Sequence, residues 1–105
     1  MPQSLVQNYQ HIVFSTKGRQ PFLKDSSSRL MMHRYLALVC IDMDSPPIQI
    51  GGVDDHVHIF CRLSKSILLT TFLKQLKTES SKWAKRELPA CERFYWQGGY
   101  GAFSV

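Results

Sequence analysis

The first regular element is marked by side chains that alternate in character along the chain. From Tyr9 to Thr16, odd and even positions would face opposite sides of a sheet, and the segment is rich in β-branched and aromatic residues. A basic loop, Lys17–Pro21, follows, and its glycine and proline interrupt regular structure. The pattern therefore predicts a first strand that ends at a basic loop.

Two stripes with three- and four-residue spacing predict two helices. The first helix starts at Asp25–Ser28, where short oxygen-bearing side chains can cap exposed amides, and it continues to about Ile41. Its stripe comprises Leu30, Arg34, Ala37 and Ile41, with Leu38 beside it. The second helix runs from Ser66 to Leu88, where Pro89 stops it. Its apolar face comprises Leu69, Phe72, Leu73, Leu76, Ser80 and Trp83.

Two further strands are expected between the helices and one after them. Ile48–Val53 and His56–Leu63 have strand composition, with a turn between them that makes a hairpin, and Phe94–Val105 is a last strand interrupted by two glycines. The order β-α-β-β-α-β is typical of the α+β, ferredoxin-like fold. Its antiparallel sheet carries both helices on one face and leaves the other open for a ligand. We expect residues 1–105 to form one such domain.

Composition narrows the class of partner. The chain has 105 residues, 44% of them apolar, and a formal net charge of +5, which suits nucleic acid or an anionic membrane surface as well as an ordinary basic protein. No apolar run approaches the roughly 20 residues that span a bilayer, and the first residues lack a signal-peptide pattern, so we expect no membrane association. Cys40, Cys61 and Cys91 have no paired spacing, which favours a reducing cytoplasm.

The sharpest chemical feature is His56-Val57-His58. Residues two apart on a strand share a face, so both imidazoles would stand side by side on the open face and could bind one divalent ion. Two histidines can also simply decorate an exposed strand. Asp54 and Asp55 could supply a ligand, orient an imidazole, or only form the turn.

A cationic stripe on the second helix is another candidate for function. Lysines one turn apart can follow phosphates, although a solvated helix face gives the same pattern. Together with the first loop, the expected nucleic-acid contacts are Lys17, Arg19, Lys74, Lys77 and Lys85. Tyr95, Trp96 and Tyr100 could stack on bases if they lie on the open face, or else they belong to the core.

The other histidines and Cys40 are weaker candidates for functional residues. His33 is expected on a helix surface, the place of His11 stays open, and Cys40 is expected in the core. The chain has no Walker loop, dinucleotide fingerprint or nucleophile elbow, so nucleotide-dependent and hydrolase classes have no support.

Three blocks together resemble the single-tyrosine HUH transposases of the insertion-sequence-200/605 type, including their REP-associated relatives. They are V-F-S-T-K-G-R-Q-P at 13–21, G-G-V-D-D-H-V-H-I at 51–59 and F-Y-W-Q-G-G-Y-G-A-F-S-V at 94–105. The blocks follow the order of the expected elements and cover essentially the whole chain. The D-H-x-H block is moderately specific alone and highly specific together with the last block.

The resemblance implies a ferredoxin-like domain that dimerises and acts on single-stranded DNA, often beside a hairpin. It implies that His56 and His58 bind a divalent ion, magnesium or manganese, which polarises the scissile phosphate. In the family a tyrosine hydroxyl attacks that phosphate, and the free 3′-hydroxyl later allows strands to be rejoined.

The family's nucleophilic tyrosine, and a glutamine that completes its metal site, lie on a helix beyond the position of Val105. We therefore expect this chain to lack that helix and to be catalytically incomplete. Tyr100 matches the strand motif rather than the nucleophile, and Tyr9, Tyr35 and Tyr95 have no counterpart.

Two other functions fit the same expected fold. A non-catalytic nucleic-acid-binding module is the main alternative, because RNA-recognition domains share the topology. Those domains carry aromatic residues on their central strands, where this chain has the two histidines. A small metal- or ligand-binding protein is a third possibility, against which the basic stripe counts.

Overall fold

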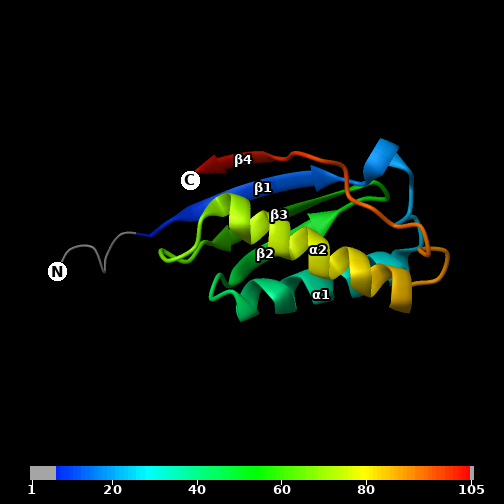
Figure 1. Cartoon of the computed structure of the whole chain (residues 1–105), viewed down its shortest axis with the longest axis horizontal. Helices are drawn as coiled ribbons and strands as arrows, with labels where there is room; N and C mark the ends of the chain where they lie inside the picture. The colour runs from blue at the N-terminus through cyan, green and yellow to red at the C-terminus, as the bar shows by residue number, and fades with distance from the viewer. Residues whose placement is uncertain (1–6, 105) are drawn as a thin grey trace.

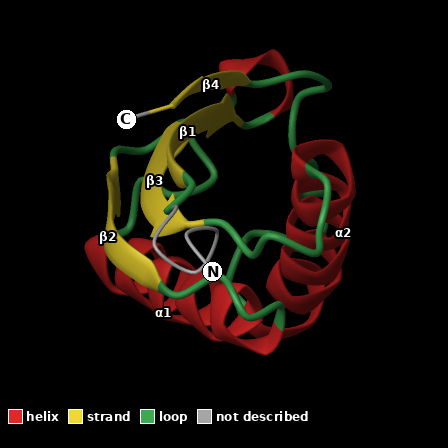
Figure 2. Ribbon diagram, turned by 90° about the vertical axis from the view of Figure 1, so that its left-hand side faces the viewer, coloured by secondary structure: helices red, strands yellow, loops and turns green. Residues whose placement is uncertain are grey.

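The computed structural model describes residues 7–104 and confirms the ferredoxin-like architecture. Its elements are β1 (Tyr9–Ser15), a short 3₁₀ helix η2 (Lys17–Arg19), α1 (Ser26–Asp42), β2 (Pro47–Gly52), β3 (His56–Arg62), α2 (Leu69–Glu87) and β4 (Gly101–Ser104). The strands form one antiparallel sheet in the order β2-β3-β1-β4, so β1 and β3 are central. Both helices lie on one side of this sheet (Figures 1 and 2).

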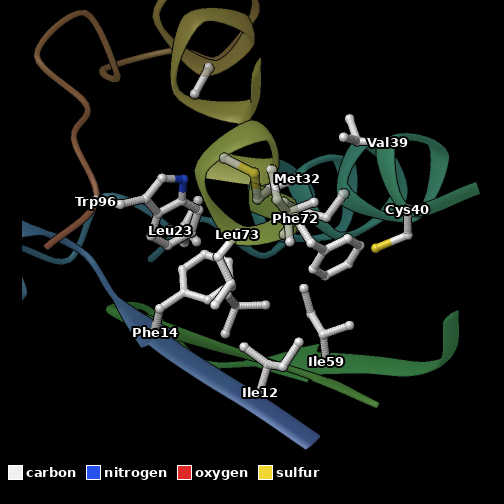
Figure 3. Close-up of a cluster of buried hydrophobic side chains, with 14 of the residues drawn as sticks. Ile12, Phe14, Leu23, Met32, Val39, Cys40, Ile59, Phe72, Leu73 and Trp96 are labelled. Atoms are coloured by element: carbon white, nitrogen blue, oxygen red, sulfur yellow. The ribbon is translucent and has the colours of Figure 1, made fainter. Parts of the chain in front are cut away.

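Alternation along the central strands separates a core face from an open face. Ile12 and Phe14 on β1, and Val57 and Ile59 on β3, are at most 2% exposed and point toward the helices. Figure 3 shows Ile12, Phe14 and Ile59 beneath side chains of both helices. The side chains between them in sequence are half-buried and face away from the helices.

Helix α2 buries the face that its sequence pattern predicts, although it begins at Leu69 rather than Ser66. Trp83 at the rim of that face stacks on Tyr35 of α1, with ring centroids 4.6 Å apart. The buried side chains are Phe72, Leu73, Leu76, Ser80 and Ala84. In the described part of the chain, neither helix combines the length and apolar character that a membrane span requires.

The stripe that helical spacing marks on α1 is not the face that this helix buries. Leu30, Leu38 and Ile41 are 50%, 62% and 57% exposed. The buried side chains are instead Ser28, Met32, Leu36, Val39 and Cys40. Helix α1 carries apolar residues on several sides, so spacing alone does not select the face that meets the sheet. Its expected start is confirmed, because the Ser28 amide donates to the Asp25 carboxylate at 2.8 Å.

The last strand is much shorter than expected. Regular pairing covers only Gly101–Ser104, and Val105, its expected end, lies outside the described residues together with Met1–Val6. Trp96 forms an isolated bridge with Thr16 and is buried, and its indole Nε1 donates to Ser80 Oγ at 2.8 Å. Residues 98–100, between this bridge and β4, are not in a strand, so regular pairing resumes only at Gly101.

His33 is also not the surface residue that its sequence position suggested. It is half-buried, and among the described side chains its Nε2 is buried without a hydrogen-bond partner. Burial lowers the pKa of His33, and the nearby charges of Arg29 and His58 lower it further. The folded protein therefore favours the neutral imidazole.

This burial predicts a loss of stability in mild acid. Because the pKa of His33 is lower folded than its usual 6.5, its contribution is complete above that value and is lost as pH falls through the folded pKa. Urea unfolding with EDTA should give a smaller free energy of unfolding at about pH 5.5 than at about pH 7.5. A His33→Leu variant should lose less over the same interval, and an identical loss would contradict this origin.

Candidate metal and nucleic-acid site

His56 and His58 lie on the open face of central strand β3, as their spacing predicts. Both are half-buried, whereas Val57 between them is fully buried beneath the helices. In the sheet, His58 is paired with Val13 of β1 and Gly51 of β2, so neighbouring strands flank it on both sides. The two imidazoles therefore share a surface that a ligand can reach.

The glycine opposite His58 provides room for its ring. A Cβ atom built on Gly51 would lie 2.7 Å from Cε1 and 2.8 Å from Nε2 of His58. These separations are shorter than a carbon can tolerate, so the imidazole occupies the space that any side chain would need. The first glycine of the G-G-V-D-D-H-V-H block thus lets His58 lie flat against β2.

Asp55 orients the other histidine. Its Oδ1 lies 2.9 Å from Nδ1 of His56, and its Oδ2 lies 3.5 Å from a guanidinium nitrogen of Arg19. The hydrogen bond from His56 is the main cause that lowers the pKa of Asp55, and Arg19 adds to it. An ionised carboxylate only accepts, so Nδ1 of His56 carries the proton and Nε2 is left as the free donor atom for a metal.

The loop after β1 holds the turn that carries Asp55. Thr16 N–H donates to the Asp55 carbonyl at 2.8 Å, and Leu23 N–H donates to the Asp54 carbonyl at 2.9 Å. Asp54 therefore contributes through its backbone to the turn. Arg19 adopts a positive φ of 53°, a conformation uncommon outside glycine, which brings its side chain beside Asp55.

The expected cationic residues fall into two groups. Lys17, Arg19 and Lys74 are exposed. Lys77 is half-buried and donates to the carbonyls of Gln97 and Gly99 at 2.9 and 2.6 Å, so it fastens the segment before β4 to α2. Lys85 lies 3.7 Å from the ring centroid of Tyr95, which Lys17 approaches at 5.9 Å from the first loop.

The aromatic candidates also separate. Trp96 belongs to the core, with ring centroids 4.7 Å from Phe14 and 4.8 Å from Phe94 in edge-on contacts. Tyr95 and Tyr100 are 55% and 44% exposed. Tyr95 lies beside the lysines of the first loop and α2.

A family model described as "Transposase IS200 like" matches residues 4–105. The chain belongs to the IS200-like transposase family. The comparison with curated proteins found no match. Among solved structures, a Deinococcus radiodurans protein assigned as a transposase superposes with a TM-score of 0.84 at 18% identity, over 95% of this chain and 80% of that one. A REP-associated tyrosine transposase bound to a REP hairpin gives 0.68 at 12% identity, over 93% of this chain and 56% of that one.

The donor set of this IS200-like transposase fits a metal held by two imidazoles with open positions. Among the described residues, no three histidine, cysteine, aspartate or glutamate side chains gather closely enough to hold an ion by themselves. The carboxylate behind His56 and the clear space at Gly51 are the features that favour ligation. Further positions would be filled by oxygen atoms of water or of a phosphate.

The open face of this transposase also holds two rings whose place the sequence pattern does not predict. His11 lies on β1 with its centroid 6.1 Å from that of His58, and Phe60 lies on β3 two residues beyond His58. Alternation alone placed His11 on the same side as Tyr9 and Val13. Only the pairing of β1 with β3 brings it beside the histidine pair.

Proposed function

We propose that this chain binds single-stranded, hairpin-containing DNA and contributes to metal-assisted strand cleavage and rejoining in DNA transposition. The observation that carries the proposal is the histidine pair on the open face, with Asp55 bonded to Nδ1 of His56. Membership of the IS200-like transposase family supports the same role.

In this proposal, neighbouring residues prepare both histidines to bind a metal. Asp55 keeps the proton of His56 on Nδ1, so that Nε2 is left for a metal, and Gly51 leaves room for the ring of His58 against β2. A magnesium or manganese ion held there would act as a Lewis acid on a phosphate oxygen. Arg19 sits where it can approach a phosphate while it contacts Asp55.

The proposed DNA partner is a single strand with a hairpin. The REP-associated transposase that shares the fold was solved with a REP hairpin, and we extend that class of ligand to this chain. Phosphate contacts are assigned to cations of the first loop and α2. They are Lys17, Arg19, Lys74 and Lys85, with the third proton of Lys77 also available.

Binding of a labelled hairpin oligonucleotide tests the partner. We expect affinity to fall steeply with salt, because bound counterions are released, and Lys17→Gln or Lys85→Gln should each reduce the salt slope by about 1. Lys24→Gln removes an exposed cation of the same loop region outside the proposed contacts and should leave the slope unchanged. Salt-independent binding, or none at low salt, would refute the partner.

Calorimetric titration with Mn²⁺ tests the metal site. The His56→Ala/His58→Ala variant should show no binding, and Asp55→Asn should weaken binding by about 10- to 100-fold because the orienting carboxylate is lost. Unchanged Mn²⁺ affinity in the double variant would place any ion elsewhere. The hairpin experiment in EDTA then separates DNA binding from metal binding.

We further propose a homodimer formed through the β4 edge. Within the described residues β4 pairs with β1 alone, so its outer backbone groups are available to a second chain. A two-fold related copy would extend the sheet across that edge. Sedimentation equilibrium should show dimers at micromolar concentration, and monomers at every concentration would contradict this assembly.

A metal-independent nucleic-acid-binding module is the second candidate, and one observation favours it. Tyr9 and Phe60 stack on the open face of the two central strands, where RNA-recognition domains carry their base-binding aromatics. Histidines and aromatics therefore occur together, and their presence does not separate the two functions as the sequence suggested. Nucleic-acid affinity that EDTA and the histidine variants leave unchanged would favour this module.

We also propose the cytoplasm as its compartment. The three cysteines are free and buried. Burial raises the pKa of Cys40 to about 12 and that of Cys61 to about 11, so both remain thiols. Thiols used as core side chains suit a reducing environment.

A further inference from the structure

Three rings form a row that leads to the histidine pair across the open face. The centroid of Tyr9 lies 6.0 Å from that of Phe60, Phe60 lies 5.7 Å from His11, and His11 lies 6.1 Å from His58. The rings alternate between β1 and β3 because those strands pair in antiparallel register, with His11 opposite Phe60. We call Tyr9, Phe60 and His11 the aromatic row.

Cations lie at both ends of the line that the aromatic row and the histidine pair form together. Arg62, the last residue of β3, is exposed and is paired with Tyr9. It also lines a cavity of about 440 Å³ with Ser64 and Lys65, and a smaller one of about 190 Å³ with Tyr9. At the other end of β3, Arg19 lies 3.5 Å from Asp55, whose carboxylate also contacts His56. A polyanionic strand lying along β3 would therefore meet positive charge at each end.

We propose that the aromatic row binds unpaired bases of a single DNA strand that passes over the histidine pair. The inference rests on the proposed function and adds to it a base-binding site on the face opposite α1 and α2. Every base has a π-face, so stacking on Tyr9 and Phe60 accepts many sequences, while Arg62 contacts the backbone. None of these three side chains belongs to the cationic set assigned above.

The spacing of the rings selects a single strand over a duplex. Adjacent bases along one strand of a duplex rise by about 3.4 Å, whereas the rings of the row are 5.7 to 6.1 Å apart. Successive bases can use successive rings only if they are spread apart, as an unpaired strand allows. The half-buried rings also lie on rigid central strands, which lowers the ordering cost of binding.

Comparison of a short oligothymidylate with an abasic oligonucleotide of equal length tests the row. The full chain with Mn²⁺ should bind the oligothymidylate at least about 5-fold more tightly for each stacked base, by fluorescence anisotropy. Phe60→Leu and Tyr9→Leu keep apolar volume but remove the ring, and each should bring this ratio toward one. Leu38→Ala removes an exposed side chain of α1 and should preserve the ratio.

The measurements distinguish the row from its alternatives. Equal binding of both oligonucleotides by the unmodified chain would overturn the row, even where hairpin DNA still binds and the proposed function stands. Loss of Mn²⁺ affinity in Phe60→Leu with no change in the ratio would make the ring a support for His58 only. Tighter binding of an oligouridylate would overturn the DNA assignment. Base-dependent binding by a chain that binds neither Mn²⁺ nor hairpin DNA would support the row and refute the proposed function.

Discussion

A Gly51→Ala variant should fold and lose most of its affinity for Mn²⁺. The added Cβ would lie within 2.8 Å of two atoms of the His58 ring, which can rotate away because it is the end of a side chain. Rotation moves Nε2 away from the position against Gly51 that it has in this structure. We expect a loss of at least about 10-fold in Mn²⁺ affinity, similar to other changes in the support of a metal ligand.

Substitution of the neighbouring glycine, Gly52, should instead reduce the stability of the fold. A Cβ on Gly52 would collide with the backbone carbonyl of His56 and lie 3.0 Å from Cα of Val57. These are main-chain atoms of the β2–β3 pairing, so the strands must move apart. Gly52→Ala should reduce the free energy of unfolding by about 1–3 kcal/mol.

Titration calorimetry and urea unfolding, applied to both variants, separate these effects. Gly51→Ala should keep a free energy of unfolding close to that of the unmodified chain. Wild-type Mn²⁺ affinity in Gly51→Ala would show that the position of the His58 ring does not matter for ligation. An equal loss of stability in both variants would remove the distinction between side-chain and backbone contacts.

Replacement of Trp96 by alanine should cause the largest loss of stability. The indole is only 8% exposed, lies edge-on to Phe14 and Phe94, and donates to Ser80 at 2.8 Å. Its removal would leave a cavity between α2 and the sheet, near the labelled Phe14 and Leu73 (Figure 3). We expect this cavity to reduce the free energy of unfolding by about 3–5 kcal/mol. That is a large share of the roughly 5–15 kcal/mol that stabilises a typical domain.

Two conservative variants divide this effect into its parts. Trp96→Phe keeps most of the apolar contact, and Ser80→Ala leaves the indole N–H without its acceptor, at a cost of about 1–3 kcal/mol. Urea unfolding followed by circular dichroism measures all three. A loss below about 1 kcal/mol for Trp96→Ala would mean that the segment before β4 contributes little to the fold.

The sequence predicts the fold well wherever one face of an element is clearly apolar. Alternation in β1 and β3 and the single apolar face of α2 identify the core face, which then fixes the histidines on the opposite side. The sequence does not predict the buried face of α1, because apolar residues surround this helix. Only contact with the sheet decides that Leu36 is buried and Leu38 is exposed.

Site residues that depend on pairing between distant segments could not be read from spacing. Asp55 and Asp54 are equivalent in sequence, and only the carboxylate of Asp55 reaches His56. Lys77 belongs to a cationic stripe, yet it binds carbonyls of a segment 20 and 22 residues later. Phe60 gains its partners Tyr9 and His11 only through the register of β1 with β3.

Because the strands of the two halves of the chain alternate in the sheet, both halves are needed to form the face that carries the histidines. Divided at the Asp54-Asp55 turn, the first half would carry β1 and β2 and the second β3 and β4, yet β1 lies between β3 and β4 and β3 lies between β2 and β1. Each half thus inserts a strand into the other (Figure 1). A chain cut within this turn would yield two complementary fragments, and recovery of Mn²⁺ binding on mixing them would report their reassembly.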